Sequence, residues 1–587
     1  MTASTFPPPP KVRESRFDDW MFRFWKGFDR ADSSVTAAIT GYVNVRSFGA
    51  TGDGTTDDTT AVLAAISSAA SSGRRRIYFP AGTYRLTSAL TISGDMFLFG
   101  DGRDASILKV DHSGNGINYS GNIATRDTDC LTIEHLALKS NNSSAGAALY
   151  GAWTITGSGA IVAQPTHVIQ HVAIGSASSA AAFTYGINFW GSQHGVINDV
   201  SVYGYESGTT ASGSYGILLN GGNSSGAWTT STAYSVNTVV TQSNLTYRCL
   251  IAHTSGTFAT YLAAGKWVYI NTTDCKIRDC TIHYCETGIY CLDCEGIHIQ
   301  QNTILSCLDG IVFDTTQTIG KPYADITGNH MNVGRYGVRM REMTQFIVAD
   351  NLIYGDQNTP LSGTSFIGVY VDSGSMGSGV ETQSIVRDNI VLMVAETGGG
   401  YSTANYGYAV YGGSGTVESV LFKGNKSQGC DTLIYLDSSS TKVVVLDDNI
   451  GTDGATWSDN GTYNSTPYGA YTPTPYAITN IGLDSDIDPY EATWTRTGNI
   501  VTVYGDVDID PTAANAATTF RLSLPVPTDM GASTQLSGVI TPNYGVNTPS
   551  GAASGHLATS PDRVQFDLYV TFTSPSRFSY CYRYRVS

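Results

Sequence analysis

Two aspartates and one arginine occupy the same position in three repeats of the sequence, and residues of these types could support acid–base chemistry. Asp314, Arg341 and Asp372 each follow a glycine by four residues. If the repeats form adjacent parallel strands about 4.8 Å apart, the two carboxyl groups are about 9.5 Å apart with the guanidinium between them. Glycosidases that invert configuration hold their acid and base about 6.5–9.5 Å apart, which leaves room for a water molecule. The pattern therefore predicts that Asp314 and Asp372 are a catalytic pair for glycosidic bond hydrolysis.

Side chains suited to binding an oligosaccharide are predicted on the same outward face. Arginine binds carboxylates and hydroxyl groups, and aromatic rings offer flat apolar faces to sugars. The residues expected to contact substrate are Arg339, Arg341, Tyr370, Tyr290, Tyr411, Glu342, Trp190 and Asn220. Glu286, Asp293, Asp309 and Glu342 are carboxylates that could replace either aspartate. Alternatively, the aspartates and arginines only form ion pairs across neighbouring strands.

The elements that must position these residues are predicted from a repeat of about 22 residues between Thr273 and Asn460. Residues one and three places after the repeated glycine are apolar, whereas those two and four places after it are mostly aromatic or charged. Because side chains alternate across a strand, the first set should face inward and the second outward. Such a repeat predicts a right-handed parallel β-helix, a solenoid in which each coil buries its apolar face against its neighbours. The aligned segments are 288–292, 310–314, 337–341, 368–372 and 407–411.

An asparagine also recurs once per coil. We expect each amide to pair with the coils on either side and to tolerate a left-handed backbone conformation. The spacing widens after Asn351 and Asn389, where loops at 354–365 and 396–405 absorb the extra residues. Loops inserted into such folds often build the binding face. The asparagines are Asn302, Asn329, Asn351, Asn389, Asn425 and Asn449.

Composition and charge limit the classes of function. Of 587 residues, 64 are glycine and 14% are charged, and the net charge of −16 argues against a nucleic-acid partner. The sequence has no apolar run long enough for a membrane span and no secretory signal pattern. Ten cysteines include the pair Cys291 and Cys294, but no second pair follows at the spacing of a zinc site. We therefore predict that the cysteines are buried free thiols in a reducing cytosol, and that the chain binds no metal and no cofactor.

Residues 42–110 contain the most specific motif in the chain. The run from Phe48 to Asp58 reads FGATGDGTTDD, and an alanine-rich segment after it predicts a helix to about Ser71 with Asp57 or Asp58 as its N-cap. The stretch closely resembles the opening of the pectate-lyase-like right-handed parallel β-helix of bacteriophage tailspikes, or tail fibre depolymerases, and of some glycoside hydrolases. The resemblance implies that the helix caps the first coil and that the aspartates of the motif are structural.

The first 40 residues differ from the coils. A proline stretch precedes the segment Phe17–Phe28, whose large apolar groups predict a short amphipathic helix that nothing nearby could cover. We expect residues 1–40 to anchor the chain to a partner, which the tailspike resemblance implies is a phage tail or adaptor protein. Alternatively, the helix folds back on the main domain.

Two other segments depart from the coil pattern. Residues 224–271 resemble small carbohydrate-binding modules of the chitin-binding type, which implies sugar binding by Trp228, Tyr234, Tyr247 and Trp267. Alternatively, these aromatics form the insert's own core. Residues 471–587 alternate apolar and polar positions around turns such as Gly498-Asn499, which predicts an antiparallel β-sandwich. That segment resembles C-terminal domains of phage tail proteins, which implies trimerisation or glycan binding.

Together these features predict an all-β chain with an anchoring segment (1–40), a β-helix (41–470) and a C-terminal β-sandwich (471–587). The β-helix includes its capping helix and first coils (41–110) and the insert (224–271). The resemblance implies a parallel homotrimer in the phage tail, made in the host cytoplasm. It would bind and depolymerise a bacterial capsule, exopolysaccharide or O-antigen by hydrolysis. The alternatives are a polysaccharide lyase with Arg339, Arg341 or a tyrosine as base, a non-catalytic receptor-binding spike, and a secreted pectinase.

Overall fold

The computed structural model describes most of the chain from residue 41 onward. The predicted anchoring segment and Glu342 lie outside the described residues. The chain divides into two compact units, residues 1–294 and 295–587, and each is described by itself. The ranges not described are 1–40, 124–127, 156–164, 179–180, 206–212, 222–226, 237, 243–244, 270–271, 315–320, 342, 356–364, 373–380, 394–404, 412–416, 438–439, 442, 446–448, 452–455, 460–467, 498–499, 527, 529–531, 544–549, 557–562 and 587.

The first unit opens with the predicted helix, α3 (Thr59–Ser71), which buries one apolar face against the first coil. Asp58 precedes the helix, but its carboxylate accepts hydrogen bonds from the backbone N–H groups of Thr51 (2.7 Å) and Gly52 (3.1 Å) instead of capping. Asp57 accepts from the backbone N–H of Thr59 at 3.0 Å. The two adjacent aspartates therefore have different roles. Asp58 fixes the glycine-rich loop, and Asp57 binds the first turn of the helix.

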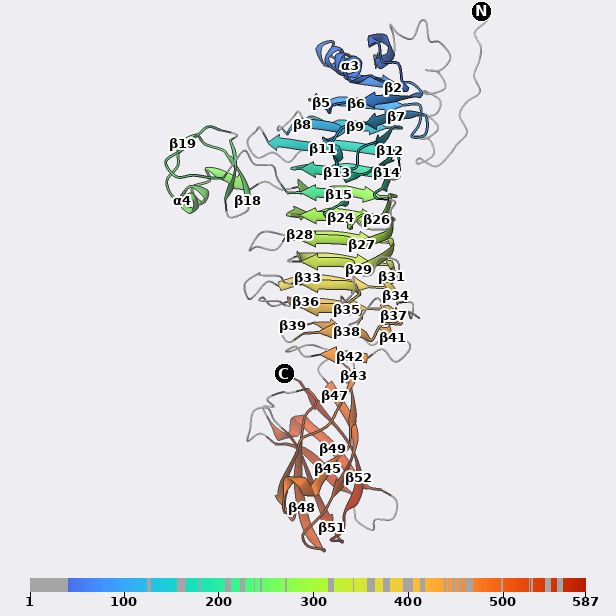
Figure 1. The fold of residues 1–587 in the computed structure, drawn as a ribbon. Helices are drawn as coiled ribbons and strands as arrows, with labels where there is room; N and C mark the ends of the chain where they lie inside the picture. Colours follow the sequence, from blue (N-terminus) through green and yellow to red (C-terminus); the bar gives the residue numbers. More distant parts are fainter. Residues whose placement is uncertain are drawn as a thin grey trace, which may run out of the picture. The chain divides into compact units, whose positions relative to one another are not determined.

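The coils of the first unit are parallel strands in three stacks (Figure 1). β12 and β14 belong to two stacks, because the chain turns within them at His171 and Asp199, which have φ of 54° and 49°. The first stack is β1 (Val43–Asn44), β3 (Arg76–Phe79), β6 (Met96–Gly100), β9 (Leu131–Glu134), β12 (His167–Ser176), β14 (Val196–Tyr203) and β22 (Lys276–Arg278). The second is β2 (Asp53–Asp57), β4 (Gly82–Leu86), β7 (Ser106–Val110), β10 (Ala137–Ser140), β12, β14 and β23 (Thr281–His283). The third is β5 (Leu90–Ser93), β8 (Ile117–Ile123), β11 (Ala145–Ile155), β13 (Phe183–Trp190), β15 (Tyr215–Asn220) and β24 (Thr287–Leu292).

The second unit repeats the same arrangement. Ile311, Val338, Val369 and Tyr408 lie opposite one another on successive strands and are fully buried, so the predicted inward column is confirmed there. Val312 and Ala409, which the alignment places in the outward set, are also buried. One stack is β26 (Ile297–Gln300), β28 (Lys321–Thr327), β30 (Met343–Ala349), β33 (Glu381–Arg387), β36 (Val417–Lys423), β39 (Ser440–Thr441) and β40 (Val444–Val445). The second stack begins with the first halves of β27 (Thr303–Asp314) and β29 (His330–Arg341) and continues through β31 (Leu352–Gly355), β34 (Ile390–Met393), β37 (Lys426–Gln428) and β41 (Ile450–Gly451). The third stack begins with the second halves of β27 and β29 and continues through β32 (Ile367–Asp372), β35 (Tyr406–Tyr411), β38 (Thr432–Leu436) and β42 (Thr456–Asp459).

The asparagines form a continuous buried ladder in the second unit, as predicted. Each Nδ2 donates to the Oδ1 of the next asparagine at 2.8–3.0 Å, from Asn302 through to Asn449. From Asn329 onward, Nδ2 also donates to a backbone carbonyl of the preceding coil. The expectation of a left-handed asparagine is wrong, because the positive φ belongs to the residue before each of the first five asparagines: Gln301, Gly328, Asp350, Asp388 and Gly424. The amide is therefore held in place by its own hydrogen bonds, and the sharp turn is made one residue earlier.

The cysteines of the first unit are free and mostly buried. Cys275, Cys280, Cys285, Cys291 and Cys294 have relative exposures of 0–2%. Burial raises the pKa of the Cys275 and Cys280 thiols to about 12. These thiols pack as small apolar groups, which confirms the prediction for this cluster.

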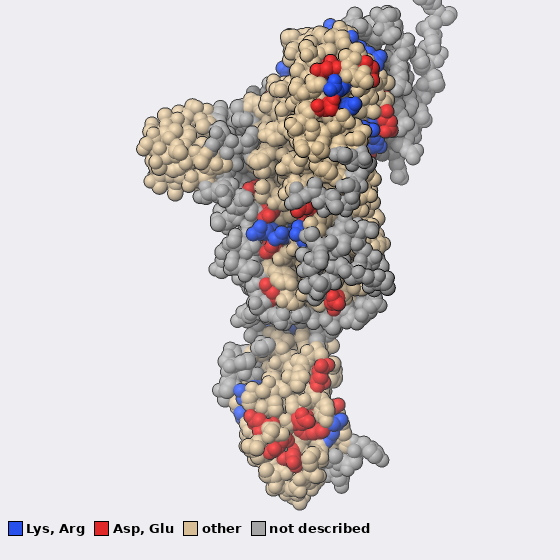
Figure 2. Space-filling model, viewed as in Figure 1, with Lys and Arg blue, Asp and Glu red and all other residues tan. Residues whose placement is uncertain are grey.

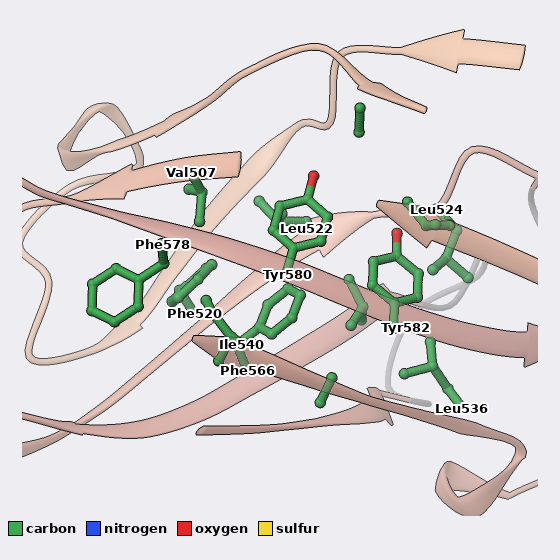
Figure 3. Close-up of a cluster of buried hydrophobic side chains, with 14 of the residues drawn as sticks. Val507, Phe520, Leu522, Leu524, Leu536, Ile540, Phe566, Phe578, Tyr580 and Tyr582 are labelled. Carbon is green, nitrogen blue, oxygen red and sulfur yellow. The ribbon is translucent and has the colours of Figure 1, made fainter. Parts of the chain in front are cut away.

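The insert and the C-terminal domain have separate cores. The insert contains β16 (Ala233–Tyr234), β17 (Val239–Gln242), β18 (Leu245–Cys249), β19 (His253–Thr254), α4 (Phe258–Ala263) and β20 (Trp267–Tyr269). The C-terminal domain is a ten-stranded antiparallel sheet whose apolar side chains, including Phe520, Phe566 and Phe578, gather in one core (Figure 3). Its strands are β43 (Tyr468–Tyr471), β44 (Pro475–Thr479), β45 (Ile487–Pro489), β46 (Ala492–Thr497), β47 (Ile500–Ile509), β48 (Ala516–Ser523), β49 (Leu536–Pro542), β50 (Gly551–His556), β51 (Arg563–Val570) and β52 (Ser576–Arg585).

Candidate functional site

Strands β27, β29, β32 and β35 bring the predicted chemical residues into one column. Arg341 lies opposite Asp372, and Asp372 lies opposite Tyr411. Phe313 lies opposite Met340, so Asp314 falls beside Arg341 on the neighbouring strand. Two strand spacings separate Asp314 from Asp372, or about 9.5 Å. The column order predicted from the glycine alignment is thus the order in the structure.

Both aspartates form ion pairs with arginine. Arg341 donates from Nη1 to Asp314 Oδ1 at 3.2 Å, and its Nε lies 3.9 Å from Asp372 Oδ2. Arg339 donates from Nη2 to Asp372 Oδ2 at 2.9 Å. The side chains of Asp314 and Asp372 are only 17% and 8% exposed. The alternative of an ion-pair ladder is therefore present in the structure, and any chemistry at this column must start from it. Figure 2 likewise shows basic and acidic side chains lying close together on the visible face of the molecule.

Arg339 is held more tightly than a surface arginine. Its guanidinium carbon lies 5.4 Å from the ring centroids of both Tyr336 and Tyr370, which places it within cation–π distance of each. Burial acts to lower its pKa, but the hydrogen bond and charge of Asp372 outweigh burial, so the net pKa is raised. Among the described residues its buried Nε has no hydrogen-bond partner. Arg339 therefore stays charged and is held between Asp372 and the two tyrosine rings.

Residues that sequence reasoning missed extend the site along β27 and β29. Arg335 donates to both oxygens of Asp309, from Nε at 2.9 Å and from Nη2 at 2.5 Å. Burial raises the pKa of Asp309 even though Arg335 opposes that shift. Asp309 was predicted from the sequence only as a substitute carboxylate, and Arg335 and Tyr336 were not predicted. Their signal was the Arg-Tyr pair directly before the glycine of the repeat.

Tyrosines continue the same face across four strands. Ring centroids of Tyr336 and Tyr370 are 5.3 Å apart, those of Tyr370 and Tyr411 5.4 Å, and those of Tyr411 and Tyr435 5.0 Å. Tyr406 joins Tyr435 at 5.1 Å. Burial, followed by the charge of Asp372, raises the pKa of Tyr370, and burial with the neighbouring Tyr406 raises that of Tyr411. The site therefore presents phenol rings on successive coils, of which only Tyr370 and Tyr411 were predicted from the sequence.

Three of the predicted substrate-binding residues lie in the first unit, apart from the column: Trp190, Asn220 and Tyr290. Trp190 lies opposite Asn220 on β15, and its Nε1 donates to Asn188 Oδ1 at 2.8 Å. Asn220 is buried. Tyr290 contacts Tyr215 with ring centroids 5.2 Å apart, and Tyr185 stacks on Tyr215 in turn. Tyr290 therefore belongs to an aromatic stack of the first unit, whereas the ion pairs of Arg335, Arg339 and Arg341 lie in the second unit.

The insert corrects part of the sugar-binding prediction. Tyr234, Tyr247 and Trp267 have exposures of 8%, 7% and 3% and form the core of the insert with Val240, Cys249 and Phe258. Buried rings have no face to offer a sugar. Trp228 packs against this core and is only partly buried, so it is the one of the four whose ring is accessible. The aromatics supply most of this core, while the aliphatic side chains of Val236, Ile251 and Leu262 are exposed.

Metal-binding groups and membrane-spanning helices are both absent from the described residues. No group of three His, Cys, Asp or Glu side chains there is arranged to hold a metal ion. No helix within the described part is long and apolar enough to cross a membrane.

Two protein-family models match the chain. The rhamnogalacturonase A/epimerase, pectate lyase-like model covers residues 42–257, and the right-handed β-helix model covers residues 267–450. The chain thus contains a pectate-lyase-like region followed by a right-handed β-helix region, as the repeat and the opening motif predicted. Mannuronan C5-epimerase AlgE3 of Azotobacter vinelandii is 34% identical over 74 residues, which is 11% of this chain and 4% of that protein. The chain therefore spans only a small part of that curated relative.

Solved structures with a similar fold include two phage tailspikes and a glucanase. The Dettilon tailspike is 15% identical, with 94% of this chain and 97% of that chain covered and a TM-score of 0.48. The tailspike of Escherichia coli bacteriophage HK620 is 10% identical, with 95% and 96% covered and a TM-score of 0.42. The α-1,3-glucanase of Streptomyces thermodiastaticus is 15% identical, with 73% and 69% covered and a TM-score of 0.37.

Proposed function

We propose that this chain binds a bacterial surface polysaccharide on the outward face of β27, β29, β32, β35 and β38 and hydrolyses one of its glycosidic bonds. The observation that carries the proposal is the column of Asp314, Arg341 and Asp372, one residue per strand in register. The backbones of Asp314 and Asp372 lie two strand spacings apart, about 9.5 Å, which is at the upper end of the carboxyl separation of inverting glycosidases and beyond the 5–5.5 Å of retaining enzymes. The pectate-lyase-like family match supports a carbohydrate ligand.

Hydrolysis at this column needs one protonated carboxyl and one carboxylate. Asp372 contacts two arginines, and this arrangement suits it to accept a proton from the attacking water. Asp314 pairs with Arg341 and is the more exposed of the two aspartates. Its carboxyl would donate a proton to the leaving glycosidic oxygen once a bound sugar draws Arg341 away. The neutral tyrosine rings would hold the sugars on either side of the cleaved bond.

A non-catalytic receptor-binding spike is the second candidate. The ion pairs of Asp314 and Asp372 favour it, because paired side chains of this kind also serve as a stable outer surface. A lyase that uses Arg339 or Tyr370 as base is less favoured. The raised pKa of each group keeps it protonated near neutral pH, and a base must be deprotonated.

The biological setting proposed for this activity is the tail of a phage virion. Support comes from the resemblance of residues 42–110 to the opening of tailspike β-helices. Residues 1–40 would attach the chain to a tail or adaptor protein, and three chains would associate in parallel.

The test of the function is product analysis on surface polysaccharides. Wild-type protein, Asp314→Asn, Asp372→Asn and the control Asp350→Asn would be incubated with a panel of purified capsules and O-antigens. Asp350 is an exposed carboxylate of the same coils, 3.6 Å from Arg387, and lies outside the column. Mass spectrometry should show products heavier by one water from the wild type and the control only. Products without added water indicate a lyase, and binding without products indicates a receptor-binding spike.

A further inference from the structure

The C-terminal sheet displays two arginines on adjacent strands of its outer face. Arg521 lies opposite Gln565, and Ser523 lies opposite Arg563. The alternating residues Phe520, Leu522, Val564 and Phe566 are fully buried, so the arginines point away from the core. Arg521 and Arg563 are thus diagonal neighbours, whose Cα atoms lie about 7–8 Å apart.

Both guanidinium groups are held by neutral partners. The guanidinium carbon of Arg563 lies 3.4 Å from the centroid of the Tyr476 ring. Arg521 donates from Nε to Gln565 Oε1 at 3.0 Å, and Tyr476 lies opposite Arg521 on β44. Stacking on a ring and a hydrogen bond from Nε each fix the plane of the guanidinium. The remaining N–H groups are therefore preorganised for a planar acceptor.

Neither arginine is neutralised by a carboxylate within the described part of the chain, where no ion pair closer than 4.0 Å involves either one. The charge of Asp567 acts on Arg521, but its carboxylate accepts hydrogen bonds from Thr519 and Gln565 instead. Burial lowers the pKa of Arg521, and the positive charge of Arg563 lowers it further. By contrast, Arg577 of the same domain pairs with both oxygens of Asp508. The two arginines therefore repel each other, and a bound anion would relieve that repulsion.

We propose that Arg521 and Arg563, positioned by Gln565 and Tyr476, bind the anionic group of an acidic saccharide. A carboxylate or sulfate fits the two forked donors, and neighbouring Ser523, Thr519 and Gln565 supply groups that pair with sugar hydroxyls. The chain's net charge of −16 repels extended polyanions such as nucleic acids, so an isolated charge among hydroxyl groups fits best. The site lies in the C-terminal domain and does not depend on hydrolysis at the β-helix.

Calorimetric titration of the full-length chain tests this site. The probes are trigalacturonic acid, its fully methyl-esterified form, and a sulfated galactose trisaccharide. We expect at least one anionic probe to bind and the ester not to bind. Arg521→Gln and Arg563→Gln should each weaken binding by about tenfold, because a hydrogen bond to a charged group is lost. Arg583→Gln is the matched control, because Arg583 is an exposed arginine on the outer face of β52.

The outcomes separate the two anion sources and identify failure. Binding of trigalacturonate alone assigns a carboxylate site, and binding of the sulfated sugar alone assigns a sulfate site. Three results would overturn the proposal. The methyl ester binds as well as the acid, neither anionic probe binds, or the Arg521→Gln and Arg563→Gln variants bind as tightly as the Arg583→Gln control. Melting curves of each variant establish that the C-terminal domain still folds.

Discussion

Asn389 is the residue whose removal should most directly weaken the asparagine ladder. Its fully buried Oδ1 accepts from the backbone N–H of Asn351 at 3.1 Å and from Nδ2 of Asn351 at 2.9 Å. Its own Nδ2 donates to Val348 O and Asn425 Oδ1. Asn389→Ala leaves both donors of Asn351 without this acceptor, and a buried polar group left unsatisfied costs about 1–3 kcal/mol. We expect local opening of this coil to become easier by about 3–5 kcal/mol, more than a hundredfold in the opening equilibrium.

Hydrogen exchange followed by mass spectrometry measures that opening where it occurs. Peptides that contain Asn351 and β34 should exchange faster in Asn389→Ala, whereas peptides of the C-terminal domain should not change. Asn141→Ala is the control, because Asn141 is exposed and its side chain donates to Asp111. If the peptides around Asn351 exchange at the wild-type rate, the ladder does not stabilise the coils and the reasoning fails.

Three further predictions follow from buried groups. Burial lowers the pKa of His167 from 6.5 to about 3, so the unfolded chain binds more protons between these values. The contribution of neutral His167 to the free energy of unfolding should be fully present above pH 6.5 and should fall by up to roughly 5 kcal/mol as the pH drops toward 3. In acid-unfolding curves the His167→Leu variant should not show this loss. A curve unchanged from the wild type would contradict the prediction. Burial raises the thiol pKa of Cys275 to about 12, so Cys275 should resist iodoacetamide in the folded protein while the partly exposed Cys581 reacts. Early labelling of Cys275 in peptide maps would contradict its burial. Trp267→Ala should lower the stability of the insert by about 3–5 kcal/mol, which hydrogen exchange would show as faster exchange in β17 and β18. Retained protection of these strands would mean that the ring is not part of the core.

The column of the candidate site could be predicted from sequence because three patterns share one period. The glycine, the inward apolar pair and the asparagine all recur once per coil, so aligning one aligns the others. Alternation across a strand then places Asp314, Arg341 and Asp372 on the same face. Inserted loops change the distance along the chain between coils, but they leave Asp372 opposite Tyr411.

The contacts made by the long side chains could not be predicted in the same way. An arginine on an outward column can reach neighbours on either strand, and which one it chooses depends on local charge and packing. Arg339 reaches Asp372 on the next strand, whereas Arg335 reaches back to Asp309. The aromatics of the insert were ambiguous for another reason, because tryptophan and tyrosine serve equally as core residues and as sugar platforms.

The glycine column explains why the site and the core cannot shift independently. A Cβ on Gly310 would lie 2.4 Å from the carbonyl oxygen of Gly337, and one on Gly337 would lie 2.5 Å from that of Gly368. Close approach of neighbouring backbones, not an unusual φ, therefore requires glycine at these positions. Each glycine sets how closely its strand packs on the next strand, and the residue four places later stays in register from strand to strand. The alignment of Asp314, Arg341 and Asp372 is thus a consequence of backbone packing, and any larger residue in the glycine column would disturb the ion pairs without touching them.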